Sequence, residues 1–183
     1  VSRFGLPEDL VVILSEGRDL EALLRTNQRL VDEVARSGGG LTLFSAGQGL
    51  PTAASQAGVA DAMARSGVSA ADLRGRVEIA AEAAGFRPGV FAPFLERIPR
   101  LLDPSSRVTF EGYQHHGLGE LLSPYIARTP DGFAMAAYVH PRSSADLVLM
   151  RSIVDRVGAP LRLTGIPIVN RELSEGLVPQ FLI

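Results

Sequence analysis

The sequence predicts an α+β fold in which an alanine-rich helical segment interrupts a small β-sheet with its helices. Residues 9–47 have the pattern of a strand, a helix and a strand, and residues 121–169 that of two strands, a helix and a strand. Two such halves in one sheet describe a ferredoxin-like (split βαβ) domain. We therefore expect residues 1–48 and 108–183 to form an α/β subdomain, and residues 49–107 to form a helical insertion.

The first half has well-marked boundaries. The run DLVVILSEG at 9–17 is aliphatic and β-branched and ends on glycine, which is typical of a buried strand. Asp19 is of a residue type that caps helices, and leucine, valine and alanine then recur at three- and four-residue spacings. The pattern predicts a helix that ends at Gly38–Gly40, followed by a second strand over LTLFSAG at 41–47.

The alanine-rich stretch from Leu50 to Leu102 predicts two or three short helices that pack closely, because alanine adds little bulk. Ser55 and Ser69 are cap or turn residues, and glycines and a proline separate the helices. Pro93 and Pro99 are expected to bend or break a helix and so to form a hinge.

The second half begins with residues 108–122, whose pattern favours no single element. Residues 121–129 and 132–141 predict two strands joined by a tight turn at Pro130–Gly132, and Pro124 predicts that the first of them lies at an edge or begins late. A helix capped by Ser143 or Ser144 and ended by Gly158 should follow. The run LRLTGIPIV at 161–169 predicts the closing strand.

Composition narrows the functional classes. The chain has 183 residues, of which 46% are hydrophobic and 21% charged, so it can bury a core. Its net charge of −2, with the charges scattered along the chain, does not support binding to nucleic acid. The absence of cysteine excludes disulfides and thiolate catalysis. No run approaches the roughly 20 apolar residues of a membrane span, and the first residues lack the pattern of a signal peptide.

The polar residues form no catalytic pattern. His115 and His116, if they lie in a strand, point to opposite faces and make a poor pair of metal ligands. The pairs Glu78/Glu82 and Glu172/Glu175 each share a helix face, which indicates a solvated surface. The glycine runs match no phosphate-binding motif. We therefore expect no catalytic residue, no metal and no cofactor, and a metal-dependent hydrolase built on the histidines is disfavoured.

The C-terminal segment carries a resemblance to a known family. The run LTGIPIVNREL, followed by the apolar residues Leu177, Val178, Phe181, Leu182 and Ile183, resembles the segment that re-enters the membrane in transporters of the resistance-nodulation-division superfamily, especially their MMPL-type, predicted-exporter branch. The opening strand and helix, the element with Leu50, Pro51 and Gln56, and the run GFRPGVFAPFLERI resemble the same extracytoplasmic loop. The similarity runs in order through nearly the whole chain.

The resemblance implies a function. The chain would be an extracytoplasmic, porter-type loop of a proton-driven exporter of lipids or other hydrophobic substrates, more in keeping with the second loop than with the first. It would lie on the periplasmic side of a bacterial inner membrane, with the parent's transmembrane helices and its other periplasmic loop as partners. The proton-relay carboxylates of such exporters lie in transmembrane helices, so none is carried over to this chain.

A porter domain needs an apolar path, and the insertion offers candidates for its lining. These are Met63, Phe86, Phe91 and Phe94. The alternative for each of them is a place in the helical core, because apolar residues at helical spacing are usually core residues. A second functional class also stays open, namely a free-standing ferredoxin-like module that binds a small molecule or a regulatory partner.

Overall fold

The computed structural model describes residues 10–38, 40–103 and 105–169. They divide into two units: an α/β unit, up to Thr52 and from Phe110 onward, and a helical unit from Ala53 to Thr109. The sequence places these two borders after residues 48 and 107. Each unit is described by itself below.

The α/β unit is built on a five-stranded sheet in which every pairing is antiparallel. The strand order is β2-β4-β1-β5, and β3 also pairs with β4. Because β1 takes one edge of β4 along its length, β2 and β3 share the other edge, β2 at the Val139 end and β3 at the Gly132 end. The strands are β1 (Val11–Gly17), β2 (Leu43–Phe44), β3 (Ile126–Thr129), β4 (Gly132–Val139) and β5 (Arg162–Thr164).

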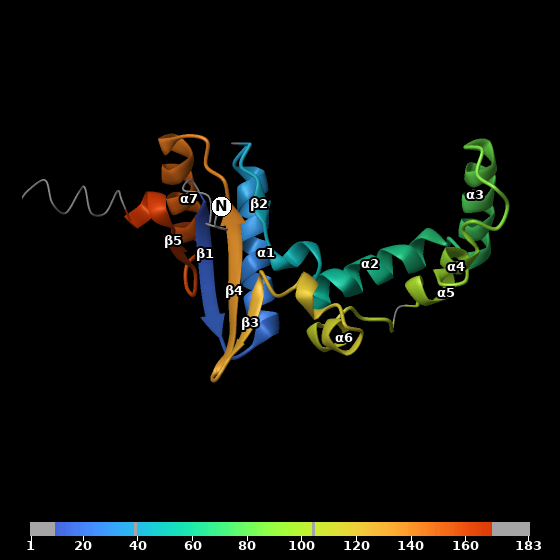
Figure 1. The fold of residues 1–183 in the computed structure, drawn as a ribbon, viewed down its shortest axis with the longest axis horizontal. Helices are drawn as coiled ribbons and strands as arrows, with labels where there is room; N and C mark the ends of the chain where they lie inside the picture. Colours follow the sequence, from blue (N-terminus) through green and yellow to red (C-terminus); the bar gives the residue numbers. More distant parts are fainter. Residues whose placement is uncertain (1–9, 39, 104, 170–183) are drawn as a thin grey trace, which may run out of the picture. The chain divides into compact units, whose positions relative to one another are not determined.

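Two helices cover one face of this sheet. In β1 and β4 every second side chain is buried, so one face points to the core. Helices α1 (Leu20–Arg36) and α7 (Ser144–Val157) pack on that face and on each other. Figure 1 shows β1 and β4 side by side, with α1 passing behind β4. The core between them is apolar and consists of Ile13, Leu30, Val34, Ala137, Val139, Met150, Ile153 and Val154.

A second buried cluster extends the core of the α/β unit. It joins the start of α1 to the 3₁₀ turn η1 (Ala46–Gln48) and to helix α6 (Phe110–His115). It also includes Leu122, the residue that follows the 3₁₀ turn η2 (Gly119–Leu121). Its buried members are Leu23, Leu24, Ala46, Leu50, Phe110, Leu122, Ile126 and Met135.

The predicted caps of the two long helices are confirmed. The Asp19 carboxylate accepts a hydrogen bond from the Glu21 N–H at 3.0 Å at the start of α1. The Ser143 hydroxyl accepts one from the Asp146 N–H at 3.2 Å at the start of α7, and Gly158, with φ 80°, follows its last residue. The turn at Pro130–Gly132 and the late start of β3 after Pro124 are confirmed as well.

The described residues of the helical unit form four helices, where the sequence predicts two or three. They are α2 (Ala53–Ser66), α3 (Ala70–Ala83), α4 (Ala92–Leu95) and α5 (Ile98–Leu101). Pro93 and Pro99 lie in the first turns of α4 and α5. A helix needs no N–H from proline there, so these residues start two short helices and do not bend a longer one.

Both outer strands are shorter than predicted. The strand expected at 41–47 ends at Phe44, because Ser45 and Ala46 turn inward and the Asn27 side-chain amide of α1 donates to the Ser45 hydroxyl at 3.2 Å. The strand expected at 161–169 ends at Thr164. There Gly165 adopts φ 131°, and its carbonyl accepts from the Val169 N–H at 3.0 Å as the chain turns helical.

The segment at 108–122, which the sequence leaves open, contains the short helix α6 and the 3₁₀ turn η2. His115 ends α6 and His116 follows it, so the idea that they alternate across a strand is wrong. Their rings lie edge to face, with centroids 5.2 Å apart, and both side chains are exposed.

Candidate functional site

The helical unit contains a cavity of about 540 Å³ between α3, α4 and the loop that joins them. Three residues of α3 line one side, at positions that share a helix face. The loop and the start of α4 line the other side. The lining residues are Glu78, Ala81, Glu82, Phe86, Arg87, Pro88, Gly89, Val90, Phe91, Ala92 and Leu95.

The end of α3 sets the position of Phe86. Gly85, with φ 78°, lets the chain reverse, so that its N–H donates to the Glu82 carbonyl at 2.9 Å. The Phe86 N–H then donates to the Ala81 carbonyl at 3.0 Å. This pair of bonds is a Schellman motif, which fixes the residue two positions after the helix cap against the last turns. Phe86 thus borders the cavity beside Ala81.

The loop brings a second aromatic ring to the same place. The Ala92 N–H donates to the Gly89 carbonyl at 3.0 Å, and the Leu95 N–H to the Phe91 carbonyl at 2.9 Å. These bonds start α4 directly after Phe91, its N-cap residue. The ring of Phe91 meets that of Phe86 with centroids 5.2 Å apart and planes at 75°. The Arg74 guanidinium of α3 reaches the Leu95 carbonyl at 3.5 Å and connects the two helices.

The charged groups at the cavity are exposed. Glu78, Glu82 and Arg87 all line it, and across the part of the chain that the structure describes none of the three makes an ion pair or a hydrogen bond through its side chain. Leu95, at 7% exposure, is the buried residue of the lining. A lining that is largely apolar and includes a few charged groups suits the binding of an apolar ligand.

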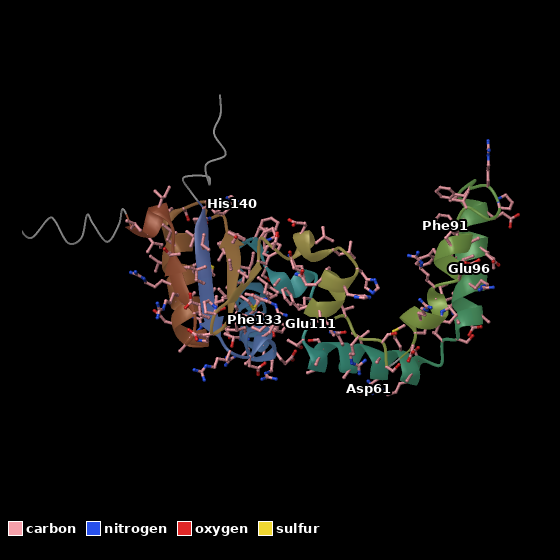
Figure 2. The ribbon with its side chains drawn as sticks, turned by 60° about the horizontal axis from the view of Figure 1, so that its bottom comes forward. Asp61, Phe91, Glu96, Glu111, Phe133 and His140 are labelled. Atoms are coloured by element: carbon pink, nitrogen blue, oxygen red, sulfur yellow. The ribbon has the colours of Figure 1, made fainter. Side chains whose placement is uncertain are left out.

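The structure brings together two of the four residues proposed for an apolar path. Phe86 and Phe91 line the cavity, whereas Phe94 and Met63 do not. Phe94 is 47% exposed on α4, and Met63 is half-buried on α2. Figure 2 shows Phe91 and Glu96 on the part of the helical unit formed by α3 to α5, and Asp61 on α2.

Sequence reasoning missed the two glutamates. It assigned Glu78 and Glu82 to a solvated helix face, and both side chains are indeed exposed, but that face of α3 also lines the cavity. The sequence did contain one sign of a cavity at this face: Ala81 lies between the two glutamates on it, and its small side chain leaves room beside the carboxylates. Which segment would come to lie opposite that face depends on the Schellman turn, which spacing on α3 alone does not predict.

The other candidate residues form no site. Within residues 10–38, 40–103 and 105–169, no three histidine, aspartate or glutamate side chains gather as a metal site would require. None of the helices in these ranges has the length and apolar character needed to cross a bilayer. The pair Glu172/Glu175 lies outside the described residues. So do the residues proposed to re-enter the membrane, which are Leu177, Val178, Phe181, Leu182 and Ile183.

Comparison with known proteins gives no assignment. No family model matches the chain, and neither a curated protein nor a solved structure is significantly similar to it.

Proposed function

We propose that this chain is an extracytoplasmic domain of a proton-driven inner-membrane exporter, and that its helical unit forms part of the path of a lipid or another hydrophobic substrate. The observation that carries the proposal is the cavity in the helical unit, in which Phe86 and Phe91 meet at 5.2 Å. Both residues were singled out from the resemblance to exporter loops. A concave site with aromatic walls is what an apolar ligand requires.

The α/β unit supports the proposal through its topology. Without β3, the short helix α6 and the two 3₁₀ turns, its elements run β-α-β-β-α-β. Its strand order is β2-β4-β1-β5, and helices α1 and α7 lie on one face of the sheet. From this connectivity we infer a split βαβ, or ferredoxin-like, domain. A porter-type subdomain was expected to have this fold.

The face of the sheet opposite α1 and α7 supports a partner domain. In β1 and β4 the residues that point away from α1 and α7 are largely apolar, among them Val12, Leu14 and Tyr138. Leu14 is 38% exposed, and Phe44, which is paired with Tyr138 across strands, is 41% exposed. Apolar side chains gathered on one open face mark interaction surfaces. We assign this face to the other periplasmic loop of the same parent protein.

The proposal places the chain on the periplasmic side of a bacterial inner membrane, connected to transmembrane helices. Its first test is the parent gene. It should encode apolar segments of about 20 residues directly before Val1 and directly after Ile183. A stop codon just past Ile183 would instead favour the free-standing module.

The second test is whether the domain carries apolar molecules. We expect mass spectrometry of organic extracts to find bacterial lipids bound to the purified chain. The double variant Phe86→Ala/Phe91→Ala should retain roughly a tenth as much or less, since two aromatic rings contribute at least about 1.4 kcal/mol to such binding. Phe94→Ala, which changes an exposed ring of the same unit that does not line the cavity, is the matched control and should retain the parent amount. Extracts free of apolar molecules, or equal amounts in the double variant, would contradict the proposal.

A further inference from the structure

We propose that the cavity selects ligands that join an apolar body to an alkylammonium group, with the ammonium group received by Glu78 and Glu82 together with the rings of Phe86 and Phe91, and the apolar body by the surface beside the rings. This inference rests on the proposed function and adds the chemical class of the substrate. Three features of the cavity carry it: the placement of its carboxylates, the arrangement of its rings and its balance of charge.

The two carboxylates stand where the helix itself disfavours them. Glu78 and Glu82 are four residues apart on α3, so like charges lie side by side on one face. They belong to its C-terminal half, where the helix dipole also opposes negative charge, and no basic residue lies in its last turn. The nearest arginine on this face, Arg74, is directed to the Leu95 carbonyl instead. A cation bound between the carboxylates would relieve both repulsions.

The two rings form a corner that suits the same cation. Phe86 and Phe91 meet edge to face at 75°, so a group that enters the corner between them contacts a face of each ring. The face of an aromatic ring attracts an ammonium group, and aromatic corners recognise quaternary ammonium ligands. Ala81 and Leu95 extend the apolar surface beside the rings.

The net charge of the lining argues against a preference for anionic ligands. The lining holds two carboxylates and one guanidinium, so its side chains carry a net charge of −1 (two negative charges and one positive). An anionic amphiphile would meet twice as many like charges as opposite ones. A neutral amphiphile would gain the apolar contacts and leave the carboxylates unpaired.

Three probes of equal chain length separate these cases. Hexyltrimethylammonium, hexanol and hexanesulfonate should be titrated into the isotope-labelled 183-residue chain, with amide shifts recorded by NMR. We expect hexyltrimethylammonium to shift the amides of Ala81, Gly89 and Phe91, and to bind about tenfold or more tightly than hexanesulfonate, which corresponds to about 1.4 kcal/mol. The difference should shrink as salt is added, because exposed charges are screened.

Variants identify the groups responsible. Glu78→Gln/Glu82→Gln should weaken hexyltrimethylammonium about tenfold and leave hexanol unchanged. Glu96→Gln removes a carboxylate of the same unit that does not line the cavity, and it should change neither. Phe86→Leu/Phe91→Leu keeps apolar surface but removes the rings, and it should weaken the ammonium probe more than hexanol.

The outcomes separate this inference from the function on which it rests. If all three probes bind at the same amides with equal affinity, or if the glutamine variants bind the ammonium probe as tightly as the parent, the alkylammonium preference is wrong and the apolar cavity stands. If no probe shifts these amides, the preference and the proposed apolar path are both overturned.

Discussion

At the scale of one residue, Asp72 helps to start α3, the helix that lines the cavity. The Asp72 N–H donates to the Ser69 hydroxyl at 3.1 Å, and the Ser69 N–H donates back to the Asp72 carboxylate at 3.0 Å. The Ser69 hydroxyl also donates to that carboxylate at 2.7 Å. These bonds, the one from the hydroxyl foremost, hold the pKa of Asp72 below its ordinary value.

The capping box makes α3 sensitive to acid in a direction that can be derived. Because the pKa of Asp72 is lower in the folded chain than in the unfolded chain, its contribution to stability is complete above the unfolded value of about 3.9 and is lost as the pH falls through the folded value. Ser69→Ala should raise the pKa of Asp72 toward its ordinary value and reduce the stability of α3 by about 1 kcal/mol at neutral pH. NMR titration of the side-chain carboxyl measures the first effect and amide exchange the second.

Asp103 is a matched control in the same unit. Hydrogen bonds from the Ser105 hydroxyl and backbone N–H lower its pKa in the same way. Ser69→Ala should leave the pKa of Asp103 low, and Ser105→Ala should raise it while leaving that of Asp72 low. If both carboxyls responded to either substitution, the local cause assigned here would be wrong.

Single residues were predictable where their role is local. Asp19, Ser69 and Ser143 cap helices because their side chains reach N–H groups two or three residues away, and such a spacing can be identified in a sequence. Met63 and Phe94 belong to the other case. Their chemical type suits an apolar path, but whether a side chain reaches a cavity depends on how a helix packs, which the residue type does not specify.

At the scale of an element, Gln56 closes the helical unit on itself. Gln56 belongs to α2, and its side-chain amide makes two hydrogen bonds with the backbone of Val108, one as donor and one as acceptor. The Gln56 NH₂ donates to the Val108 carbonyl at 2.9 Å, and the Val108 N–H donates to the Gln56 carbonyl oxygen at 2.8 Å. The first helix of the unit is thereby held to the segment that leaves it. The same glutamine belongs to the Leu-Pro…Gln element of the family resemblance.

Removing this pair of hydrogen bonds should expose one backbone amide, the Val108 N–H, to hydrogen exchange. Gln56→Leu deletes two hydrogen bonds that contribute about 1 kcal/mol each, so the exchange rate of the Val108 N–H should rise roughly tenfold or more. The measurement is hydrogen exchange followed residue by residue. Gln48→Leu removes a glutamine whose amide donates at 3.3 Å to the Leu43 carbonyl in the α/β unit, and it should leave Val108 unchanged. An unchanged rate in Gln56→Leu would show that other bonds protect that N–H.

Elements with internal periodicity were predictable, whereas those that end through a distant contact were not. Helices α1 and α7 carry an apolar face, caps and stop signals within their own sequence. Strand β2 stops because Ser45 turns to meet Asn27 of α1, and β5 stops where Gly165 passes close to the Leu10 carbonyl. A Cβ at Gly165 would lie 2.6 Å from that oxygen, so only glycine fits. Neither contact is encoded in the strand that it shortens.

The whole molecule consists of two units with very different cores. Both clusters of buried apolar side chains are made of residues of the α/β unit. Among the described side chains of the helical unit, only Leu95 and Ile98 are buried apolar ones. The alanine content predicts close packing in the insertion, and this interpretation is wrong for α2 and α3, which bury none of their residues. A unit with so little buried apolar surface should open at lower free energy than the sheet and its helices.

A core variant in α7 tests whether the two units are energetically separate. Ile153 is fully buried in the cluster with Ile13 and Met150, so Ile153→Ala should destabilise the α/β unit by about 2–5 kcal/mol. Amides of β1 and α7 should lose protection against hydrogen exchange in proportion, while those of α3 should not change, since α3 contributes nothing to that core. Val148→Ala, on the same helix but 54% exposed, should stay within about 0.5 kcal/mol of the parent. If α3 lost as much protection as α7 in Ile153→Ala, the chain would unfold as one cooperative body, and the helical unit would depend on the sheet for its stability.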